Sequence, residues 1–409
     1  MVEKWMEYFQ VPAEMDLMIS LAAKDAELAP MDGIDWKRFG ELAAKNRLEP
    51  LIAAGTKKIP EEPVRQISEL ENFLSAKNSF TLFSMRQVRT LALILSDFNR
   101  YGIRALSIKG PLLAVELYGS PELRYSHDLD ILVSESDFSK ACARLEANGF
   151  REEITALNKT SKRRRTLKKS MGIIHAIYLR GDMCVELHWK LSHRMQESFE
   201  ELWERRSRKK LLGQTVCCLG ELDNLSYLIC HAAGHGYMRM RWLFDLYVLL
   251  RRPDVNWKAL YEDMVRKGIQ GMLLETLILL YRCPRFVMPA LENSLFSIGR
   301  ENGQVKLSYK EDLQADYEYG AALAEAVWPM LLMTDEERQA STLGRRYGAL
   351  LPVAGKKQSC FEVLVSFFQP SAFELGRFDF PDSLYFLYYV VRPFYRLWRM
   401  TPFYHPKAR

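Results

Sequence analysis

The feature that most constrains this chain is a pair of carboxylates at the start of a hydrophobic strand. Asp128 and Asp130 lead directly into the apolar run Ile131–Val133. Side chains two residues apart on a strand share a face, so both carboxylates would point the same way. Like charges repel each other and do nothing for a purely structural strand, whereas a divalent metal ion needs oxygen ligands placed like this. A solvated strand edge is the alternative interpretation.

The segment before the carboxylates has the pattern of an anion-binding turn. Ile103–Ile108 is short and apolar, which predicts a buried strand, and Lys109 and Gly110 end it. Leu112–Tyr118 is predicted to be a helix, since Pro111 suits a helix start. Backbone N–H groups at a helix start attract phosphate, glycine permits close approach, and lysine adds positive charge. We therefore expect an anion to bind here.

A third carboxylate is expected from a hairpin further along the chain. The pattern of residues 172–191 predicts two strands joined by a turn at residues 181–182. Alternation along the second strand places Glu186 and His188 on the face opposite to the core. A two-residue turn would also place His175 opposite His188. One face of the hairpin would then carry two histidines and a carboxylate.

In this order, the motifs resemble the nucleotidyltransferase superfamily typified by DNA polymerase beta. More narrowly, the chain is similar to the bacterial branch called the uncharacterised nucleotidyltransferase family. The positions shared with that branch are Lys109, Gly110, Tyr118, Arg124, Ser126, Asp128, Asp130, Glu186, His188 and Trp189. The wider superfamily usually has Gly-Gly or Gly-Ser at the turn where this chain has Lys-Gly. The motif resemblance covers residues 106–189.

The resemblance implies an enzyme that moves a nucleoside monophosphate from an NTP, such as ATP, to an acceptor hydroxyl and releases diphosphate. Asp128 and Asp130 would hold two Mg²⁺ (or Mn²⁺) ions. One ion would bind the triphosphate and help diphosphate leave, and the other, shared with Glu186, would lower the pKa of the acceptor hydroxyl. The predicted nucleotide-binding residues are Lys109, Gly110, Arg124 and Ser126. The acceptor is not defined by the sequence and is a small molecule, a protein or RNA.

Several histidines and one aspartate are candidates for supporting roles. His231 and His235 are four residues apart on a predicted helix, and Asp245 lies on the next one. This spacing is compatible with a metal site. The alternatives are hydrogen-bonded support or substrate contacts on a helical wall. His175 and His188 belong to the same class of supporting candidates.

Composition and cysteine usage exclude several protein classes. Hydrophobic residues make up 48% and charged residues 26% of the 409 residues, as in ordinary globular proteins. A net charge of +6 suits an anionic ligand without demanding nucleic acid. The seven cysteines are odd in number and mostly lie in apolar segments, which favours a reducing, cytoplasmic compartment. We expect neither a secretion signal nor a transmembrane segment, since no apolar run approaches about 18 residues.

We predict an α+β protein in which a small mixed-sheet nucleotidyltransferase core is embedded in a mainly helical chain. The first region, residues 1–101, contains helices over residues 14–24 and 36–45 and a long helix ending at Tyr101. The remaining regions are the core at residues 102–195, a helical domain at residues 196–300 and a mainly helical C-terminal region at residues 301–409. That last region begins with a polar linker over residues 301–310.

Two basic runs and an aromatic C-terminal segment suggest further contacts. Ser161–Ser170 and Arg205–Lys210 are rich in Lys and Arg. We expect the first to be a solvated loop, or a loop that gathers triphosphate or an acidic acceptor, and the second to lie among helices. Leu384–Met400 has arginines at helical spacing, which favours a terminal helix packed on the N-terminal bundle. A peripheral membrane or protein contact is the alternative.

Two other function classes stay open. One is a non-catalytic or regulatory nucleotide-binding module that acts through a partner, although the presence of all three carboxylates disfavours it. The other is a nucleic-acid-modifying protein that works through the basic runs, although no interleaved aromatic residues support base reading.

Overall fold

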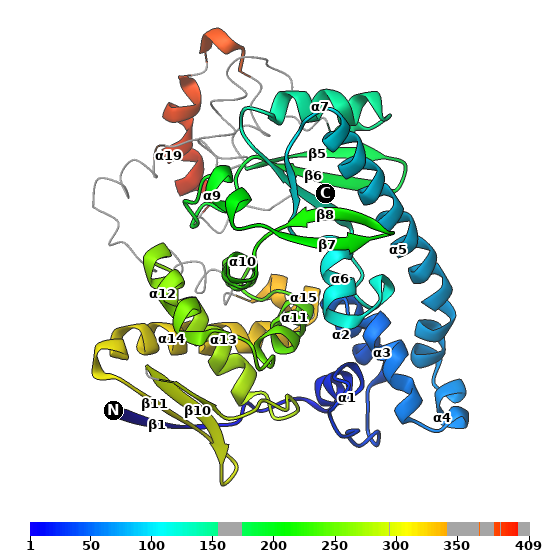
Figure 1. Cartoon of the computed structure of the whole chain (residues 1–409). Helices are drawn as coiled ribbons and strands as arrows, with labels where there is room; N and C mark the ends of the chain where they lie inside the picture. Colours follow the sequence, from blue (N-terminus) through cyan, green and yellow to red (C-terminus); the bar gives the residue numbers. More distant parts are fainter. Residues whose placement is uncertain (154–173, 294, 342–367, 369–379, 385, 400–409) are drawn as a thin grey trace.

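The computed structural model describes residues 1–153, 174–293, 295–341, 368, 380–384 and 386–399. A seven-stranded mixed sheet, in the upper part of the view in Figure 1, carries the candidate residues. In spatial order the strands are β4 (Arg151–Glu152), β5 (His175–Arg180), β6 (Met183–His188), β3 (Asp128–Val133), β2 (Ala105–Ser107), β8 (Gln214–Cys218) and β7 (Ser207–Leu211). Strand β3 pairs in parallel with β6 and antiparallel with β2. The expected α+β fold with a mixed sheet is confirmed.

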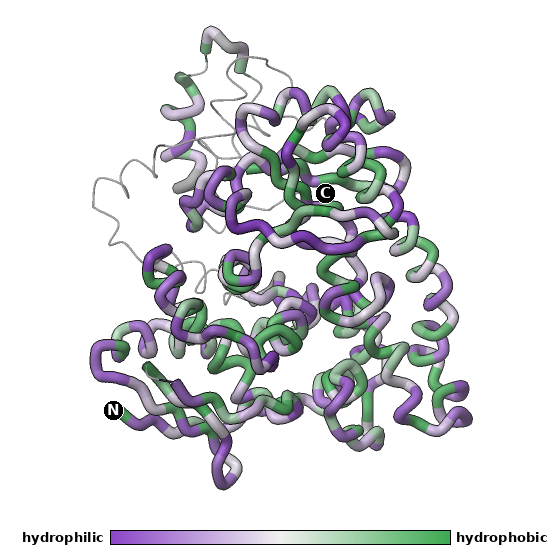
Figure 2. Tube along the Cα trace, viewed as in Figure 1, coloured by the Kyte–Doolittle hydropathy of each residue, from purple (hydrophilic) through white to green (hydrophobic). Residues whose placement is uncertain are grey.

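Two helices cover one face of this sheet. They are α5 (Ser68–Arg100) and α7 (Phe138–Ala147). Leu129, Ile131 and Val133 of β3 are fully buried in the same hydrophobic cluster as residues of both helices. Because side chains alternate along a strand, Asp128 and Asp130 point to the other face. Figure 2 shows hydrophobic residues concentrated in the central strands.

The face that carries the carboxylates is covered by other helices. They are α6 (Gly110–Tyr118), α10 (Glu221–Gly234) and α11 (Met240–Leu250). Leu132 of β3 packs in one cluster with Leu113 of α6 and Ile229 of α10. The side chains of Asp128 and Asp130 therefore lie between the sheet and this helical layer.

The three predicted N-terminal helices form as α1 (Ala13–Ala22), α2 (Trp36–Asn46) and the long α5. Two short helices that the sequence did not predict, α3 (Glu49–Gly55) and α4 (Glu61–Gln66), lie between α2 and α5. Asp35 caps α2, since its carboxylate accepts a hydrogen bond from the backbone N–H of Arg38 at 3.0 Å. Figure 1 places α5 along the outer side of the molecule, reaching from the N-terminal helices to the central sheet.

A second sheet corrects two expectations. Its four strands, in spatial order, are β1 (Val2–Glu7), β11 (Gln304–Tyr309), β10 (Phe296–Glu301) and β9 (Leu291–Glu292). Residues 1–101 are thus not helical throughout, and residues 301–310 are not a linker. Asn302 and Gly303 both have positive φ angles, as in a tight hairpin turn. This Asn-Gly pair and the alternation of Val305, Leu307 and Tyr309 were signals for the hairpin.

The second basic run also differs from expectation, because Ser207–Leu211 is the edge strand β7 rather than part of a helix. Lys209 pairs with Glu116 of α6, and Arg205 pairs with Asp223 of α10 at 3.0 Å. Positive charges on an edge strand discourage pairing with another chain. The first basic run lies outside the described residues.

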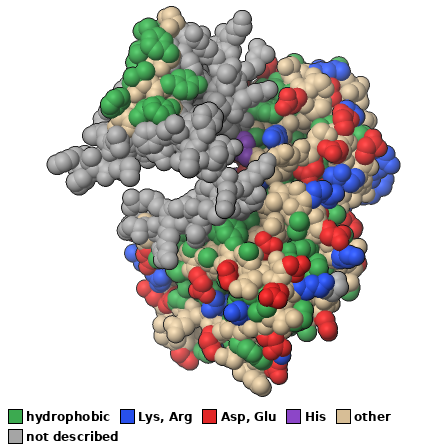
Figure 3. Space-filling model, turned by 90° about the vertical axis from the view of Figure 1, so that its left-hand side faces the viewer, with side chains coloured by type: hydrophobic (Ala, Val, Ile, Leu, Met, Phe, Trp, Pro, Cys, Tyr) green, Lys and Arg blue, Asp and Glu red, His purple; other side chains and the backbone are tan. Residues whose placement is uncertain are grey.

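The C-terminal half is mainly helical. Besides α10 and α11, its described α-helices are α9 (Phe199–Glu204), α12 (Trp257–Lys267), α13 (Gln270–Arg282), α14 (Gln314–Leu331), α15 (Asp335–Ala340) and α19 (Leu387–Arg399). Helix α13 packs against α14. Hydrophobic side chains gather on the surface of α19 (Figure 3), where Val390 and Phe394 are exposed. None of the helices in the described ranges is both long and apolar enough to cross a membrane.

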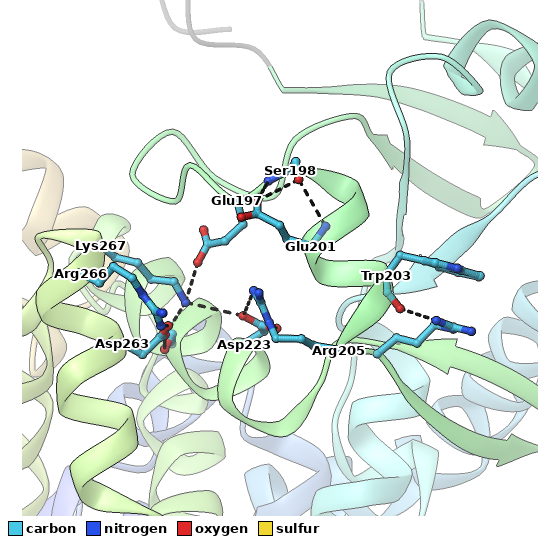
Figure 4. Close-up of polar contacts among 11 residues, drawn as sticks. Glu197, Ser198, Glu201, Trp203, Arg205, Asp223, Asp263, Arg266 and Lys267 are labelled. Atoms are coloured by element: carbon cyan, nitrogen blue, oxygen red, sulfur yellow. Dashed lines mark hydrogen bonds and ion pairs between the residues drawn. The ribbon is translucent and has the colours of Figure 1, made fainter.

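A buried ion-pair network joins the core to the C-terminal helices (Figure 4). The ammonium group of Lys267 on α12 lies 2.8 Å from Glu197 and also pairs with Asp263. It lies 3.8 Å from Asp223 of α10, which Arg205 also contacts. Lys267 is almost fully buried, so these carboxylates compensate a charge that burial would otherwise make costly.

Candidate active site

The strand register brings the candidate residues to one face of the sheet. In the parallel pair β3–β6, Asp130 lies opposite Glu186. In the antiparallel pair β5–β6, His175 lies opposite His188, as the sequence predicted. Val185 and Leu187 are fully buried on the other face. The expected orientation of Glu186 toward the aspartate pair is therefore confirmed.

Asp130 is the most enclosed carboxylate of the group. Its Oδ1 atom lies 2.9 Å from Nζ of Lys109 and 3.3 Å from Nε2 of His188. Its side chain is 1% exposed. Its Oδ2 atom is buried and has no hydrogen-bond partner among the residues that the structure describes. The Oδ1 atom of Asp130 thus contacts the nitrogens of Lys109 and His188, while its Oδ2 atom is available to a ligand.

Glu186 forms the more accessible part of the site. Its side chain is 22% exposed, and its Oε2 atom lies 3.4 Å from Nε2 of His188. The same oxygen lies 3.9 Å from Nε2 of His175. One nitrogen of His188 therefore contacts both Asp130 and Glu186, and it links β3 to β6 through side chains as well as through the backbone.

The three carboxylates differ in their preference for a proton. Burial alone would raise the pKa of Asp130, but Lys109 and His188 outweigh it and hold that pKa well below its usual range. Burial also acts on Glu186, yet the hydrogen bond with His188 lowers its pKa. At Asp128, burial and then the charge of Asp130 raise the pKa. Asp130 therefore stays ionised, and Asp128 takes up a proton more readily.

Lys109 and Gly110 stand where the sequence predicted, at the start of α6. Gly110 has a φ of +68°, which strains any other residue, and a Cβ there would lie 3.5 Å from the backbone oxygen of Asp128. The Lys109 ammonium points at Asp130 and lies 5.8 Å from the ring centre of Tyr227. The helix start and the carboxylates thus form one continuous site.

Ser126 supports the strand that carries the carboxylates. Its hydroxyl lies 3.1 Å from the backbone oxygen of Asp128 and 3.0 Å from its Oδ1 atom. The Gln87 side chain of α5 donates a hydrogen bond to the Ser126 carbonyl at 2.9 Å. Ser126 is buried, so its observed contacts hold Asp128 in place.

Arg124 and Asp245 form a buried ion pair behind the site. Nε of Arg124 lies 2.9 Å and 3.1 Å from the two oxygens of Asp245, and the Tyr118 hydroxyl donates to the same carboxylate at 3.0 Å. Arg124 and Asp245 are each 2% exposed. The pair ties the loop before β3 to α11.

The metal site considered for His231, His235 and Asp245 is not formed. Asp245 is engaged with Arg124 and Tyr118. The two imidazoles pack on each other at 4.7 Å and on the Trp242 ring at 5.3 and 5.4 Å. Burial holds the pKa of His231 well below its usual range, so its ring is neutral.

His231 of α10 and His235, which directly follows that helix, form an aromatic wall with Tyr227 and Trp242. The sequence analysis did not single out Tyr227 and Trp242. Tyr227 is the member that lies near Lys109, and its ring is 5.8 Å from that of His231. The spacing of Tyr227, His231 and His235 at every fourth position places them on one helix side, a signal that the sequence offered.

Comparison with known families agrees with this geometry. The model for a family described as "Uncharacterised nucleotidyltransferase" matches residues 32–283, more than half of the 409 residues. The chain belongs to that family. It is therefore classed as a nucleotidyltransferase, as the motifs suggested.

Two other comparisons add no functional detail. No curated protein matches this nucleotidyltransferase. Among solved structures, the solution structure of the antibiotic-resistance factor ANT(2'')-Ia shows 12% sequence identity and covers 47% of this chain and 89% of that chain. The TM-score is 0.28, a likeness too weak to support an inference.

The residues of this nucleotidyltransferase fit a divalent metal ion. Carboxylate oxygens are the ligands that Mg²⁺ prefers, and Asp130 keeps a buried oxygen without a partner among the described residues. Asp128 lies close enough for the charges of Asp130 and Glu186 to act on its pKa. A cation between these groups would remove that repulsion. Asp128, Asp130 and Glu186 are the residues that would hold it.

Proposed function

We propose that this nucleotidyltransferase moves a nucleoside monophosphate from an NTP to a hydroxyl group of an acceptor, and that the reaction needs a divalent metal ion. The observation that carries the proposal is the placement of Asp130, buried opposite Glu186 with Lys109 at 2.9 Å. A buried carboxylate that faces a second one needs compensating positive charge. Lys109 supplies part of it, and an NTP-bound cation would supply the rest.

The reaction replaces one phosphorus–oxygen bond by another. The acceptor oxygen bonds to the α-phosphorus, the bond from that phosphorus to the bridging oxygen breaks, and diphosphate leaves with the electron pair. A bound metal ion would stabilise the negative charge on the phosphates and lower the pKa of the acceptor hydroxyl. The hydroxyl proton would pass to a carboxylate of the site or to solvent.

The start of α6 provides the phosphate contacts. The N–H groups of its first turn point out of the helix, and Gly110 lets the ligand approach them closely. Lys109 forms an ion pair with Asp130. We propose that its ammonium turns to the outer phosphates when the NTP and metal arrive, because the metal then neutralises Asp130.

Two groups take positioning roles in this proposal. Ser126 holds Asp128, and Arg124 with Asp245 fixes the loop before β3. Neither Arg124 nor Asp245 is exposed enough to meet a substrate. Their effect on transfer would come through the position of β3.

The test is transfer of a labelled nucleotide. The purified protein is incubated with each of the four NTPs, labelled at the α-phosphate, with Mg²⁺ or Mn²⁺ and a cell extract, and labelled products are identified by mass. We expect one or more acceptors to gain a nucleoside monophosphate, and the Asp128→Asn variant to produce none. Binding of NTP without any labelled product would instead favour a regulatory nucleotide-binding module.

A further inference from the structure

A second set of metal-ligand atoms lies beside the aspartate pair. His175, Glu186 and His188 each offer one ligand atom, and these three atoms lie within 4.8 Å of one another. The Nε2 atom of His188 is 3.4 Å and that of His175 is 3.9 Å from Oε2 of Glu186. No other group of three such residues meets this criterion within the described part of the chain.

The spacing of these atoms approaches that of a coordination shell. Ligands at about 2.1 Å from a tetrahedral ion lie about 3.4 Å apart. The contact between His188 and Glu186 already has this separation, whereas the contact of His175 with Glu186 is 3.9 Å and all three atoms lie within 4.8 Å of one another, so the His175 ring would move toward the ion on binding. The atoms converge as they would around one ion, although each side chain comes from a different strand position.

The backbone frame that presents the ligands is rigid. His175 and His188 are direct partners in the β5–β6 ladder, and Glu186 lies two residues before His188 on the same face. Strand β6 is also paired with β3 on its other side. Ligands fixed on paired strands are held more accurately than ligands on loops, which lowers the entropy lost on binding.

The chemistry of the ligands selects a class of metal. Imidazole nitrogen suits Zn²⁺, Fe²⁺ and other first-row transition metals, whereas Mg²⁺ prefers oxygen ligands only. Two histidines and one carboxylate leave coordination positions open, which is the pattern of reactive rather than structural sites. The side chains of His175 and Glu186 are 30% and 22% exposed, so the open positions face an accessible side.

We propose that His175, Glu186 and His188 bind one first-row transition-metal ion next to Asp130. This inference deepens the proposed function and rests on it for the role of the ion in transfer. During transfer, the ion would place positive charge beside the Asp128 and Asp130 carboxylates, on the side where Glu186 lies. Metal binding itself depends only on the three ligands.

The competing explanation needs no metal. In it, the His188 ring alone bridges Asp130 and Glu186, and His175 is a neighbour without a role. The two explanations differ at His175. Only the metal site loses a ligand when the His175 nitrogens are removed.

The experiment measures metal binding by the full-length protein after treatment with a chelator. Isothermal titration with Zn²⁺, Mn²⁺ and Mg²⁺, without nucleotide, gives stoichiometry and affinity, and X-ray absorption gives the ligand elements around Zn²⁺. We expect one Zn²⁺ per chain, bound at least about a hundredfold more tightly than Mg²⁺, with nitrogen and oxygen ligands. Sulfur ligands, or Zn²⁺ binding no tighter than Mg²⁺, would overturn the proposal.

Two matched variants locate the site. His175→Phe removes the ring nitrogens at similar shape and should weaken Zn²⁺ binding by about tenfold or more. His235→Phe changes a histidine of the aromatic wall and should leave Zn²⁺ affinity unchanged. The reverse result would overturn the assignment. Circular dichroism melts of both variants check that a loss of binding is not a loss of fold.

The outcome is separable from that of the proposed function. If Zn²⁺ binds through His175 but no NTP is turned over with any metal, the site stands and nucleotidyl transfer fails. If the enzyme transfers nucleotides while His175→Phe leaves Zn²⁺ binding unchanged, transfer stands and the His175 site is wrong.

Discussion

Asp130 and Glu186 face each other across the parallel pairing of β3 and β6, although residues 131–185 separate them in the sequence. The same nitrogen of His188 contacts both, at 3.3 and 3.4 Å. Their surroundings differ, since Asp130 is 1% exposed and paired with Lys109, while Glu186 is 22% exposed. We therefore expect substitutions of the carboxylates to differ in their effects, so that loss of nucleotide transfer can be distinguished from loss of folding stability.

The first prediction compares the two aspartates of β3. Asp128→Asn should reduce nucleotide transfer by at least about a hundredfold at unchanged or slightly higher stability, because it removes a carboxylate whose charge is disfavoured by burial and by Asp130. Asp130→Asn should also abolish transfer but lower stability by about 3–5 kcal/mol, since it leaves Lys109 without its buried partner. Transfer assays and urea denaturation check both. Normal transfer by Asp128→Asn at limiting Mg²⁺ would show that it is not a metal ligand.

The second prediction concerns Lys109. Lys109→Ala should weaken binding of an NTP more than binding of the corresponding NMP, because the lost contact is with the outer phosphates. Titration with both nucleotides in the presence of Mg²⁺ measures the difference. Equal weakening of the two would mean that Lys109 acts only as the partner of Asp130.

The third prediction tests the ion pair behind the site. Asp245→Ala should lower the free energy of unfolding by about 3–5 kcal/mol, since the charge of Arg124 is left buried and unpaired. The control is Asp182→Ala, which breaks an exposed pair with Arg86 and should cost no more than about 1 kcal/mol. Urea denaturation of both variants provides the values. Similar small losses would argue against a structural role for the buried pair.

The fourth prediction is a pH dependence of stability. Burial raises the pKa of Glu49 to about 7, from an ordinary value of 4.5. The folded state thus favours the protonated carboxyl, and this contribution is complete below pH 4.5 and is lost as the pH rises through 7. Its size is at most roughly 3 kcal/mol. Glu49→Gln should therefore lose less stability than the wild type between pH 5 and pH 8.

Denaturation of both proteins at several pH values measures this difference. Glu41→Gln, at an exposed position of α2, is the control and should follow the wild type. Identical pH profiles for Glu49→Gln and the wild type would show that Glu49 is not the group responsible.

Local patterns determined much of the site. Alternation of apolar and polar residues set which face Asp128, Asp130, Glu186 and His188 occupy, because successive side chains on a strand point to opposite faces. The short turn of the β5–β6 hairpin set the register that pairs His175 with His188. Both features depend only on residues close together in the sequence, so they were predictable.

Tertiary structure decided the features that depend on distant partners. Arg124 and Asp245 lie on two elements that are far apart in the sequence, so no local pattern could predict their ion pair. Asp245 binds Arg124, while His231 and His235 pack on each other. Strand β1 forms because β11, near residue 305, supplies its hydrogen bonds.

Dependence on distant or later partners also explains the edge strand β7 and the direction of Lys109. The sequence predicted helices around residues 207–211, because a charged segment has little strand propensity of its own and forms a strand here by pairing with β8. It placed Lys109 at a turn, but only the folded sheet brings Asp130 to 2.9 Å from its ammonium group. Periodicity fixes the face on which a side chain lies, and long-range packing fixes its partner.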